Sequence, residues 1–585
     1  MTGDYLALNV RSADAAAQLT RIAHVATAYR MRTVHRSSRL LIAVGDSLDV
    51  HPLGTEIGVI IGDIYRRHVP AAAYDGAPDA RHELLGSIRK GQLTRDFWGS
   101  FVALGYEEDT EHFFALASPF STINAYTFIN ESCVAVSSNP RLLSEIADKR
   151  FSINWRAINH QLIWDDLPLS ETCLQEVTEI RSGERLSVTK DHRISIDRMW
   201  NPWEFASSGE AIAGRPDAVD RVGREIRRCV KARIPASGVL AIDLSGGLDS
   251  SVLAAVCGAR DGQTLALNLY SPQTEGDERG YARVVASHVG MALEEMTPDA
   301  GRADVSRCAT AHLPRPYARS FAQEIDRLGL EFATKAKASA FINGGGGDAV
   351  FCHLQSSAPA VDALRSFGAG PGFLKTAYEV ARAAQCPVWD VVTKSIRKAV
   401  RDPRKRSWRT DASFMTREAA SMRFTTNAPW HTVPRDVLPG KVEHVHALYT
   451  ASFNTNGLSR TGLMKGLFPL LSQPLVETCL RVPTWLWVGQ GRNRLVAREA
   501  VSQLLPSRVA GRVSKGGLGR LRRDIYQKNR DRIREILLDG SLQARGLISP
   551  RDVDEYLSAG FGVTSDQSGR LLRLCDFEAW IAAWT

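Results

Sequence analysis

The sequence predicts an α/β protein in two parts, and three observations support this prediction. Residues 1 to about 205 hold many short apolar runs separated by turn residues, which is typical of an antiparallel β domain. From about residue 212, apolar strands alternate with helical patterns, as in a parallel sheet covered by helices on both faces. A glycine-rich loop, 245–251, lies between one of these strands and a helix. We therefore expect one domain over 1–205 and a second over 212–585.

The length and composition are those of a globular protein with more than one core. The chain has 585 residues, of which 44% are hydrophobic and 23% charged, whereas a single core stops growing at about 250–300 residues. We expect a cytoplasmic protein with reduced thiols, because its nine cysteines form no CxxC pair and it shows no signal peptide. No apolar run is long enough to span a bilayer. The net charge of +9 is modest for this length and does not predict nucleic-acid binding.

The elements of the first domain are expected to be mostly strands. Few long helical patterns precede a helix expected at 140–146, and the polar stretch 206–210 is typical of a linker. The expected strands are 40–44, 58–62, 100–104, 112–116, 125–129 and 133–136.

The second domain is expected to build its sheet from 238–243, 265–270 and 340–343, and to be mostly helical after about residue 352. Ligands of such sheets bind at the carboxyl ends of the strands. Both glycine-rich loops of this half directly follow a strand, so we expect them to form one site.

The first loop reads Ser-Gly-Gly-Leu-Asp-Ser-Ser over 245–251. A strand, a glycine loop and a helix N-terminus aim several backbone N–H groups at one point, and this attracts a phosphate. The serines add hydroxyl donors. Asp249 would repel a phosphate unless a cation lay between them, so the loop predicts Mg²⁺ as well as a nucleotide. It lacks the Gly-Lys-Ser/Thr ending of a Walker A motif.

The second loop is Gly344-Gly345-Gly346-Gly347-Asp348. Four consecutive glycines carry an entropic cost, which is explained where the backbone must approach a ligand or adopt positive φ. Its aspartate repeats the logic of Asp249. Two carboxylates at neighbouring strand ends could share one or two Mg²⁺ ions that bridge the phosphates of ATP.

These two loops resemble a known family. The first is similar to the SGGxDS pyrophosphate loop of the PP-loop ATP pyrophosphatases, and the pair resembles the synthetase domain of the asparagine synthetase B family. Segments 275–286, 490–500 and 512–517 are similar to further motifs of that family. The resemblance implies a class II amidotransferase-like (Ntn-type) αββα domain, followed by a doubly wound PP-loop synthetase domain with a helical C-terminal part.

The same resemblance assigns roles to particular residues. It implies that Asp249 and Asp348 bind Mg²⁺ and take part in catalysis, and that Lys515 and Arg494 stabilise charge at the phosphates. Arg494 stands where the family has a lysine. The general base is left open, with Glu499 as one candidate. The residues implied to hold ATP, besides Asp249, are Ser245, Gly246, Gly247, Leu248, Ser250, Ser251, Leu269, Gly345, Gly346 and Gly347.

The sequence departs from the family where glutamine is hydrolysed. Glutaminase domains of this family begin with a catalytic cysteine, whereas this sequence begins Met1-Thr2-Gly3 and its first cysteine is Cys133. A thiol nucleophile must be activated by a neighbouring amine or base. We therefore expect a degenerate amidotransferase-like domain without glutaminase activity, and an amine that comes from another source. Two branches of the family fit this description, the β-lactam synthetases and the lasso-peptide macrolactam cyclases.

The second loop favours the lasso-peptide cyclases. β-Lactam synthetases carry a tyrosine three residues before the second aspartate, where this sequence has Gly345, and segment 348–356 resembles the proteobacterial cyclases. The resemblance implies that an Asp or Glu side chain of a precursor peptide is adenylated with ATP and Mg²⁺. The peptide's own N-terminal amine then closes a macrolactam ring, with release of AMP and pyrophosphate. Leader-peptidase and leader-recognition proteins of the same pathway are the implied partners, with no nucleic acid and no membrane.

Other functions stay open at this point. A small-molecule synthetase would make a β-lactam, or an amide from ammonia. An RNA-modifying PP-loop enzyme would adenylate a tRNA base, which a basic run at 394–409 mildly favours. A catalytically silent scaffold is opposed by the two intact aspartates. We interpret Cys352 and His353 as packing or supporting residues rather than as a nucleophile pair.

Overall fold

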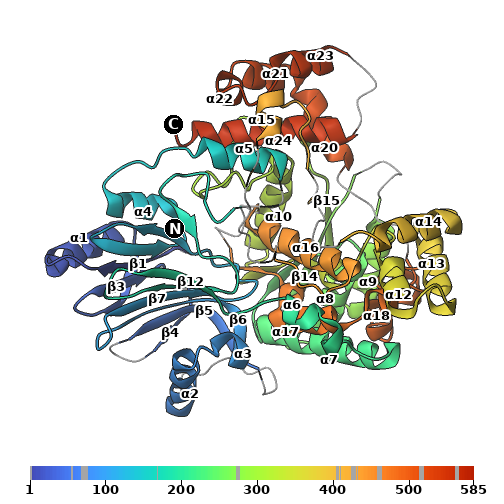
Figure 1. Cartoon of the computed structure of the whole chain (residues 1–585), viewed down its shortest axis with the longest axis horizontal. Helices are drawn as coiled ribbons and strands as arrows, with labels where there is room; N and C mark the ends of the chain where they lie inside the picture. Colours follow the sequence, from blue (N-terminus) through green and yellow to red (C-terminus); the bar gives the residue numbers. More distant parts are fainter. Residues whose placement is uncertain are drawn as a thin grey trace.

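The structure is a computed structural model, and Figure 1 shows a strand-rich N-terminal domain beside a mixed C-terminal domain. The residues that it describes are 3–53, 57–67, 77–165, 167, 169–271, 277–402, 408, 410–422, 424, 430, 432–457, 464–512, 519–559 and 565–585.

The N-terminal domain consists of two six-stranded antiparallel sheets. The first has the order β10-β8-β9-β1-β3-β2, with bounds Thr178–Glu179, Tyr126–Ile129, Cys133–Ser137, Tyr5–Val10, Leu40–Val44 and Arg32–Arg36. The second has the order β12-β11-β7-β6-β5-β4, with bounds Ile194–Arg198, Glu184–Val188, His112–Ala117, Phe97–Glu107, Gly58–Arg66 and Val50–Pro52.

Strand β1 shows how the sheets form layers. Successive side chains of a strand point to opposite faces. Tyr5 and Ala7 pack between the two sheets, whereas Leu6 and Leu8 pack on the other side, where α1 (Ala15–Ala28) and α4 (Pro140–Ala147) lie. The outer face of the second sheet packs against α2 (Pro78–Arg89) and α3 (Leu93–Asp96). The expected αββα arrangement is confirmed.

The expectation of few helices before residue 140 was wrong. Helix α1 has 14 residues, and its buried positions Leu19, Ile22 and Ala26 recur at helical spacing. These positions are separated by alanine and polar residues, so the apolar stripe is thin. Helix α2 has a similar stripe of three buried residues, Ala80, Leu84 and Ile88, and has a proline in its first turn.

The C-terminal domain is built on a five-stranded sheet of order β15-β14-β13-β16-β17, in which every pair is parallel. The strands are Ala292–Met296, Thr264–Leu269, Leu240–Asp243, Ala340–Ile342 and Gly466–Leu467. The three strands expected from the sequence are present with shifts of one or two residues at their ends. The two edge strands, β15 and β17, were not expected.

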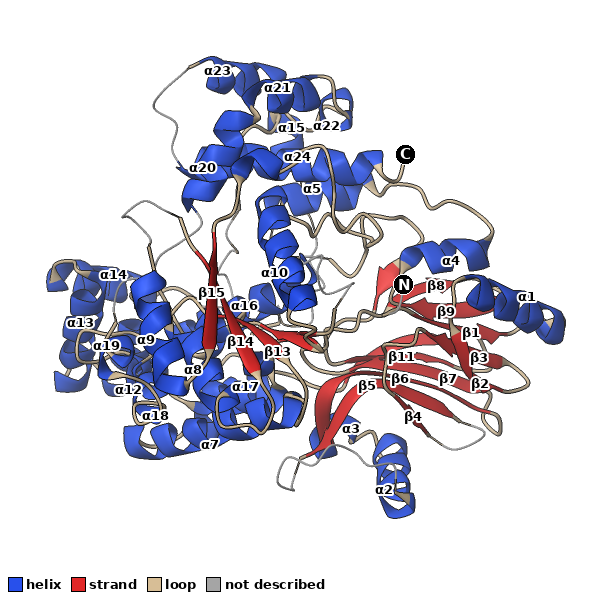
Figure 2. Cartoon of the chain, turned by 180° about the vertical axis from the view of Figure 1, so that it is seen from behind, coloured by secondary structure: helices blue, strands red, loops and turns tan. Residues whose placement is uncertain are grey.

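Helices cover both faces of this sheet, as expected. Leu240 and Ile242 of β13 pack with α7 (Arg215–Arg233), α8 (Leu248–Cys257) and α9 (Arg279–Val289). Ala241, between them, faces α10 (Gln323–Lys335) on the other side. Figure 2 shows α10 on one side of β13–β15 and α7, α8 and α17 (Gln473–Arg481) on the other.

The rest of the C-terminal half is helical. A lobe of α12, α13 and α14 flanks the sheet, with bounds Ala358–Phe367, Pro371–Ala384 and Val388–Ala399. The last helices lie together next to α5 (Trp155–Ile163) of the N-terminal half (Figure 1). This group consists of α20 (Gly519–Lys528), α21 (Arg530–Leu538), α22 (Ser541–Ala544), α23 (Pro550–Ser558) and α24 (Ser565–Ala582), together with the short helix α15 (Arg417–Ser421).

A buried carboxylate joins the two halves. Glu477 of α17 is 1% exposed, and its Oε1 accepts hydrogen bonds from Trp200 Nε1 at 2.8 Å and Gln473 Nε2 at 2.8 Å. Arg67 of the N-terminal domain forms an ion pair with the same side chain. The Gln473 amide also donates to the carbonyl of Thr94 at 2.7 Å. A buried charge is tolerated only when it is paired and hydrogen-bonded, so this cluster fixes α17 against the N-terminal domain.

We predict that Glu477→Ala destabilises the whole chain by about 3–5 kcal/mol, because it leaves the half-buried Arg67 without its charge partner and the Trp200 indole N–H without its acceptor. The measurement is the urea midpoint followed by tryptophan fluorescence. Glu210→Ala is the matched control, since Glu210 pairs with Arg481 at 3.2 Å on the surface and is 54% exposed. Equal midpoints for the two variants would contradict the assignment.

Candidate active site

The two glycine-rich loops meet at the point where the strand order reverses. β13 and β16 are neighbours, and the chain runs to β14 and β15 on one side and to β17 on the other. Such a switch point opens a crevice at the carboxyl ends of the strands. Asn343 ties the two strand ends together, because its Nδ2 donates to Asp243 Oδ2 at 2.6 Å and its Oδ1 accepts from the Gly345 amide at 2.6 Å.

Two serines shape the first loop. The hydroxyls of Ser245 and Ser250 lie 3.2 Å apart, the Gly247 amide donates to Ser245 Oγ at 3.3 Å, and Ser250 Oγ donates to the Gly247 carbonyl at 3.3 Å. Gly246 has φ +68°, and a Cβ there would lie 2.5 Å from the Cβ of Tyr281. The loop therefore needs glycine at this position both for its φ and for its contact with α9.

Helix α8 presents its N-terminus to the crevice. It begins at Leu248, and its N-cap, Gly247, supplies no side-chain hydrogen bond. The first N–H groups of a helix lack intrahelical partners and attract anions. Ser251 is fully buried, and its Oγ has no hydrogen-bond partner among the described residues.

The second loop lies directly against the first. A Cβ at Gly347 would lie 2.5 Å from Asp249 Cγ, and one at Gly344 would lie 3.2 Å from the Ser250 amide nitrogen. Gly346 has φ +84°, and a Cβ there would meet Leu471 at 2.4 Å. The run of glycines thus allows the backbone of α11 (Gly347–Val350) to touch the side chain of Asp249.

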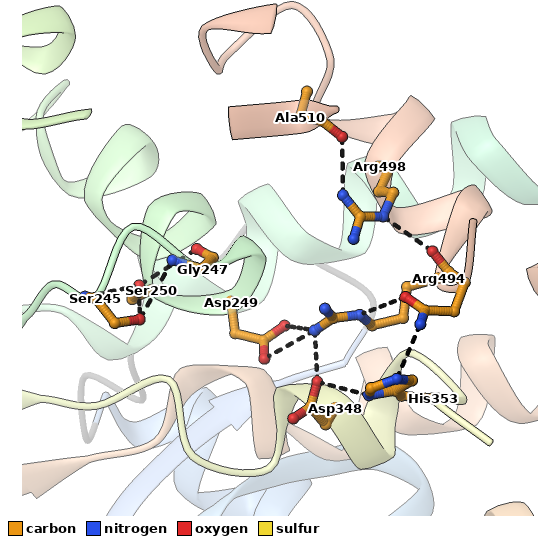
Figure 3. A network of polar contacts seen from close by, with 10 residues as sticks. Ser245, Gly247, Asp249, Ser250, Asp348, His353, Arg494, Arg498 and Ala510 are labelled. Carbon is orange, nitrogen blue, oxygen red and sulfur yellow. Dashed lines mark hydrogen bonds and ion pairs between the residues drawn. The ribbon is translucent and has the colours of Figure 1, made fainter. Parts of the chain in front are cut away.

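Arg494 lies between the two aspartates (Figure 3). Its Nη1 is 3.3 Å from both Asp249 Oδ1 and Oδ2, and 2.5 Å from Asp348 Oδ1. The Arg494 side chain is 8% exposed, against 14% for Asp249 and 37% for Asp348. The two carboxylates, 99 positions apart in the sequence, therefore both contact the same guanidinium nitrogen.

An unusual turn aims Arg494 at this position. Gln490, Gly491 and Arg494 all have positive φ, and Arg494 is the N-cap of α18 (Leu495–Ala500). Such strained backbone persists where the surroundings hold it, and it clusters at functional sites. Here the Gly491 amide donates to Glu379 Oε2 at 2.7 Å, and Arg498 Nε donates to the Asn493 carbonyl at 2.9 Å. Burial, together with the charge of Arg494, lowers the pKa of Arg498 to about 10.

His353 supports Asp348. The Asn493 side-chain amide donates to His353 Nε2 at 2.9 Å, so the ring proton lies on Nδ1, which donates to Asp348 Oδ1 at 3.2 Å. The amide orientation is consistent, because Asn493 Oδ1 accepts from Arg494 Nε at 3.4 Å. Cys352 is buried, and burial raises the pKa of its thiol. The interpretation of this pair as packing and supporting residues therefore agrees with the geometry.

Arg512 is a site residue that the sequence did not single out. Its guanidinium lies 4.1 Å from the ring centroid of Tyr281, and its Nη1 donates to the Ser245 carbonyl at 3.5 Å. An ion pair with Glu278 completes its contacts. Arg512 thus links the first loop to the start of α9. Its place at the start of the basic segment 512–517 was the available signal.

The structure describes some of the remaining predicted residues and leaves others outside its described ranges. Leu269 is half-buried at the end of β14, and Gly345 is half-buried in the second loop. Glu499 lies 3.4 Å from Arg215 Nε in an ion pair. Lys515 and much of the basic run after residue 402 lie outside the described residues. The catalytic and nucleotide-binding roles assigned above stay predictions.

The residues present fit a magnesium nucleotide. Two carboxylates that share one cationic nitrogen can share a divalent cation, and Mg²⁺ is commonly held by one or two carboxylates together with phosphates and water. Among the described residues, no group of three or more His, Cys, Asp or Glu side chains could hold a metal ion. An all-protein metal cage is therefore not part of the described site.

A comparison with known protein families identifies the family to which this chain belongs. The family model described as asparagine synthase matches residues 221–582. The chain belongs to the asparagine synthase family. Members of this family form amide bonds in ATP-dependent reactions, usually with Mg²⁺, so this chain is an ATP-dependent amide-forming ligase in type. The match covers the parallel sheet, both loops and Arg494.

Other comparisons add less. No curated protein matches the asparagine synthase-like chain. A solved structure of an allosteric regulatory enzyme of purine biosynthesis is 8% identical over 50% of this chain and 80% of its own, with a TM-score of 0.22. Glutamine phosphoribosylpyrophosphate amidotransferase from B. subtilis is 10% identical over 50% of this chain and 65% of its own, with a TM-score of 0.21. Among the described residues, none of the helices has the length and apolar character that a membrane crossing requires.

The cysteines of the N-terminal domain are not poised for nucleophilic attack. Cys133 lies in β9 and Cys173 follows α5; both are buried, and burial raises the pKa of both thiols, in Cys173 to about 12. All nine cysteines lie among the described residues, and none forms a disulfide. A raised thiol pKa means little thiolate at neutral pH.

We predict that Gly347→Ala lowers the ATP–pyrophosphate exchange rate by about 10²-fold or more, because the new Cβ displaces the Asp249 carboxylate from the position that faces Asp348. Gly86→Ala is the matched control, since Gly86 also lies in a helix without positive φ and a Cβ there meets nothing within 4 Å. Wild-type exchange in Gly347→Ala would contradict the proposed contact between the loops.

Proposed function

We propose that this ligase adenylates the side-chain carboxylate of an Asp or Glu in a precursor peptide and closes a macrolactam with the N-terminal amine of that peptide. The observation that carries the adenylation half is the pair of aspartates, which face one cation beside the N-terminus of α8. This arrangement suits a triphosphate whose α-phosphorus is attacked.

The chemistry has two balanced steps. A carboxylate oxygen of the substrate bonds to the α-phosphorus of ATP, and the bond to the bridging oxygen breaks, releasing pyrophosphate. The amine nitrogen then bonds to the acyl carbon, AMP leaves with the electron pair, and the amine loses a proton. Mg²⁺, when bound to Asp249 and Asp348, supplies positive charge to the phosphates. The chain's own part is to orient the two substrates and to stabilise charge with Arg494 and the N–H groups of α8.

The second loop supports a peptide cyclase over a β-lactam synthetase. A Cβ at Gly345 would lie 2.9 Å from Asn343 Oδ1 and 3.2 Å from Phe468. A tyrosine at this position, as in the β-lactam branch, would require the loop to move. The base of that branch therefore has no counterpart here.

The lobe α12–α14 supports a polypeptide partner. Of the nine large apolar side chains that the described residues expose, six lie on this lobe or at its end, and Trp389 and Val400 are 70% and 84% exposed. The others are Phe367, Leu374, Tyr378 and Ile396. Exposed apolar side chains gathered in one region are typical of protein or peptide contacts.

We predict that Asp249→Asn and Asp348→Asn each lower ATP–pyrophosphate exchange by about 10²-fold or more, because each removes one of the charges that hold the cation at the phosphates. The measurement is isotope exchange in the presence of the precursor peptide. Glu499→Gln, in helix α18, is the matched carboxylate control for the exchange measurement. The same variant tests separately whether Glu499 is the general base, because a base that deprotonates the amine acts after exchange. Normal exchange in both aspartate variants would refute the site.

We predict that the product is the precursor peptide with one water fewer, formed with one AMP and one pyrophosphate, and that glutamine is not hydrolysed. The substrate to test is a precursor peptide whose leader has been cleaved to expose the N-terminal amine, and it is to be sought among the short open reading frames beside the gene. Tandem mass spectrometry locates the isopeptide bond. Exchange stimulated by free aspartate, glutamate or another amino acid instead of the peptide would favour a small-molecule synthetase.

A further inference from the structure

We propose that Arg494 and a divalent cation compete for the same oxygens of Asp249 and Asp348, so that the cation binds tightly only together with nucleotide phosphates. The inference rests on the proposed function in one respect, because it takes these two carboxylates as cation ligands. It goes beyond that function by assigning Arg494 control over the order in which metal and nucleotide bind.

The geometry of one nitrogen carries the argument. Arg494 Nη1 contacts three carboxylate oxygens, two of Asp249 at 3.3 Å and one of Asp348 at 2.5 Å. A cation held by these same oxygens would lie about 2.0–2.1 Å from them in the case of Mg²⁺. The guanidinium nitrogen and the metal ion would then occupy overlapping space.

The charge balance points in the same direction. Arg494, which contacts both carboxylates, and the buried Arg498 already place two guanidinium groups at the site, where the side chains of Arg494, Asp249 and Asp348 are 8%, 14% and 37% exposed. A divalent cation added alone would bring two more positive charges next to these guanidinium groups. Like charges in a poorly solvated site repel strongly, so the cation alone is disfavoured. The phosphates of a nucleotide would supply negative charge that offsets this repulsion.

The side chain of Arg494 can change partners at low cost. Within the described residues, its guanidinium contacts Asn493, Asp249 and Asp348, whereas the backbone is held independently by Arg498 and by the cap of α18. Asp249 lies in the first turn of α8, so a phosphate at that helix N-terminus would lie next to the guanidinium. Arginine binds phosphate oxygens as well as carboxylates. A short movement of the guanidinium would then free the facing oxygens for the metal ion.

Direct measurement of Mn²⁺ binding tests the proposal, because Mn²⁺ uses the same oxygen ligands and its free form gives an electron paramagnetic resonance signal. Without nucleotide, we expect Arg494→Gln to bind Mn²⁺ at least about ten-fold more tightly than the wild type, a difference of ~1.4 kcal/mol. With α,β-methylene-ATP present, we expect the wild-type affinity for Mn²⁺ to rise and the difference between the two proteins to shrink to within about three-fold. Arg551→Gln, an 83% exposed arginine on α23, is the matched control and is expected to behave as the wild type.

Two further variants separate the possible outcomes. Arg494→Lys keeps a charge at the site and is expected to bind Mn²⁺ alone less tightly than Arg494→Gln. If it binds Mn²⁺ as tightly as Arg494→Gln, or if the wild type and Arg494→Gln bind Mn²⁺ alike without nucleotide, the competition is refuted. Asp249→Asn in the Arg494→Gln background is expected to lose the gained affinity. If Mn²⁺ binds this double variant unchanged, the carboxylates are not its ligands, and the metal site of the proposed function fails with it.

Discussion

The contact between the two glycine-rich loops is the constraint on which the site depends. Neighbouring parallel strands lie about 4.8 Å apart, so the loops that follow β13 and β16 start close together. Any side chain on the facing positions would push them apart, as the 2.5 Å approach of a Cβ at Gly347 to Asp249 makes plain. Glycine at 344 and 347 therefore serves the contact between the two loops, and glycine at 346 serves the contact with Leu471. The sequence suggested two reasons for these glycines, proximity to a ligand and positive φ. Positive φ applies to Gly346, and proximity to a ligand need not be invoked for all of them.

Much of the architecture was readable because its signals are local. The strands β3, β7, β9, β13 and β16 are short apolar runs bounded by turn residues, and each lies within two residues of its expected place. The layer order of the N-terminal domain followed from the resemblance. Helix α1 was missed because its buried face needs few large side chains: it lies over β1 and β3, and Leu19, Ile22 and Ala26 are sufficient to cover them.

In the candidate active site, too, the features with local sequence signals were predicted and the others were not. The pairing of Asp249 with Asp348 followed from placing both loops at strand ends, which needs only the strand assignments and the parallel sheet. The contacts of Arg494, Asn493 and His353 did not follow, because they depend on a left-handed turn at 490–494 and on segments 140 or more positions apart. A positive φ at a non-glycine residue has no local signature, since surrounding contacts impose it. Arg512 was not predicted for a similar reason: its partners, Glu278 and Tyr281, lie at the start of α9, more than 200 positions away in the sequence.

The N-terminal domain has a structural role that does not depend on hydrolysing glutamine. Arg67 and Trp200 of that half neutralise and bind the buried Glu477 of α17. Helix α17 in turn packs against α11 and against the turn Pro469–Leu471, whose Leu471 side chain fills the space beside Gly346. The positions of Gly346, Gly347 and Asp348 thus depend, through α17, on a domain interface more than a hundred residues away in sequence. A chain without the N-terminal domain would expose Glu477 without its partners, and its second glycine-rich loop would lose the packing that positions it. The synthetase site therefore depends on the folded N-terminal domain.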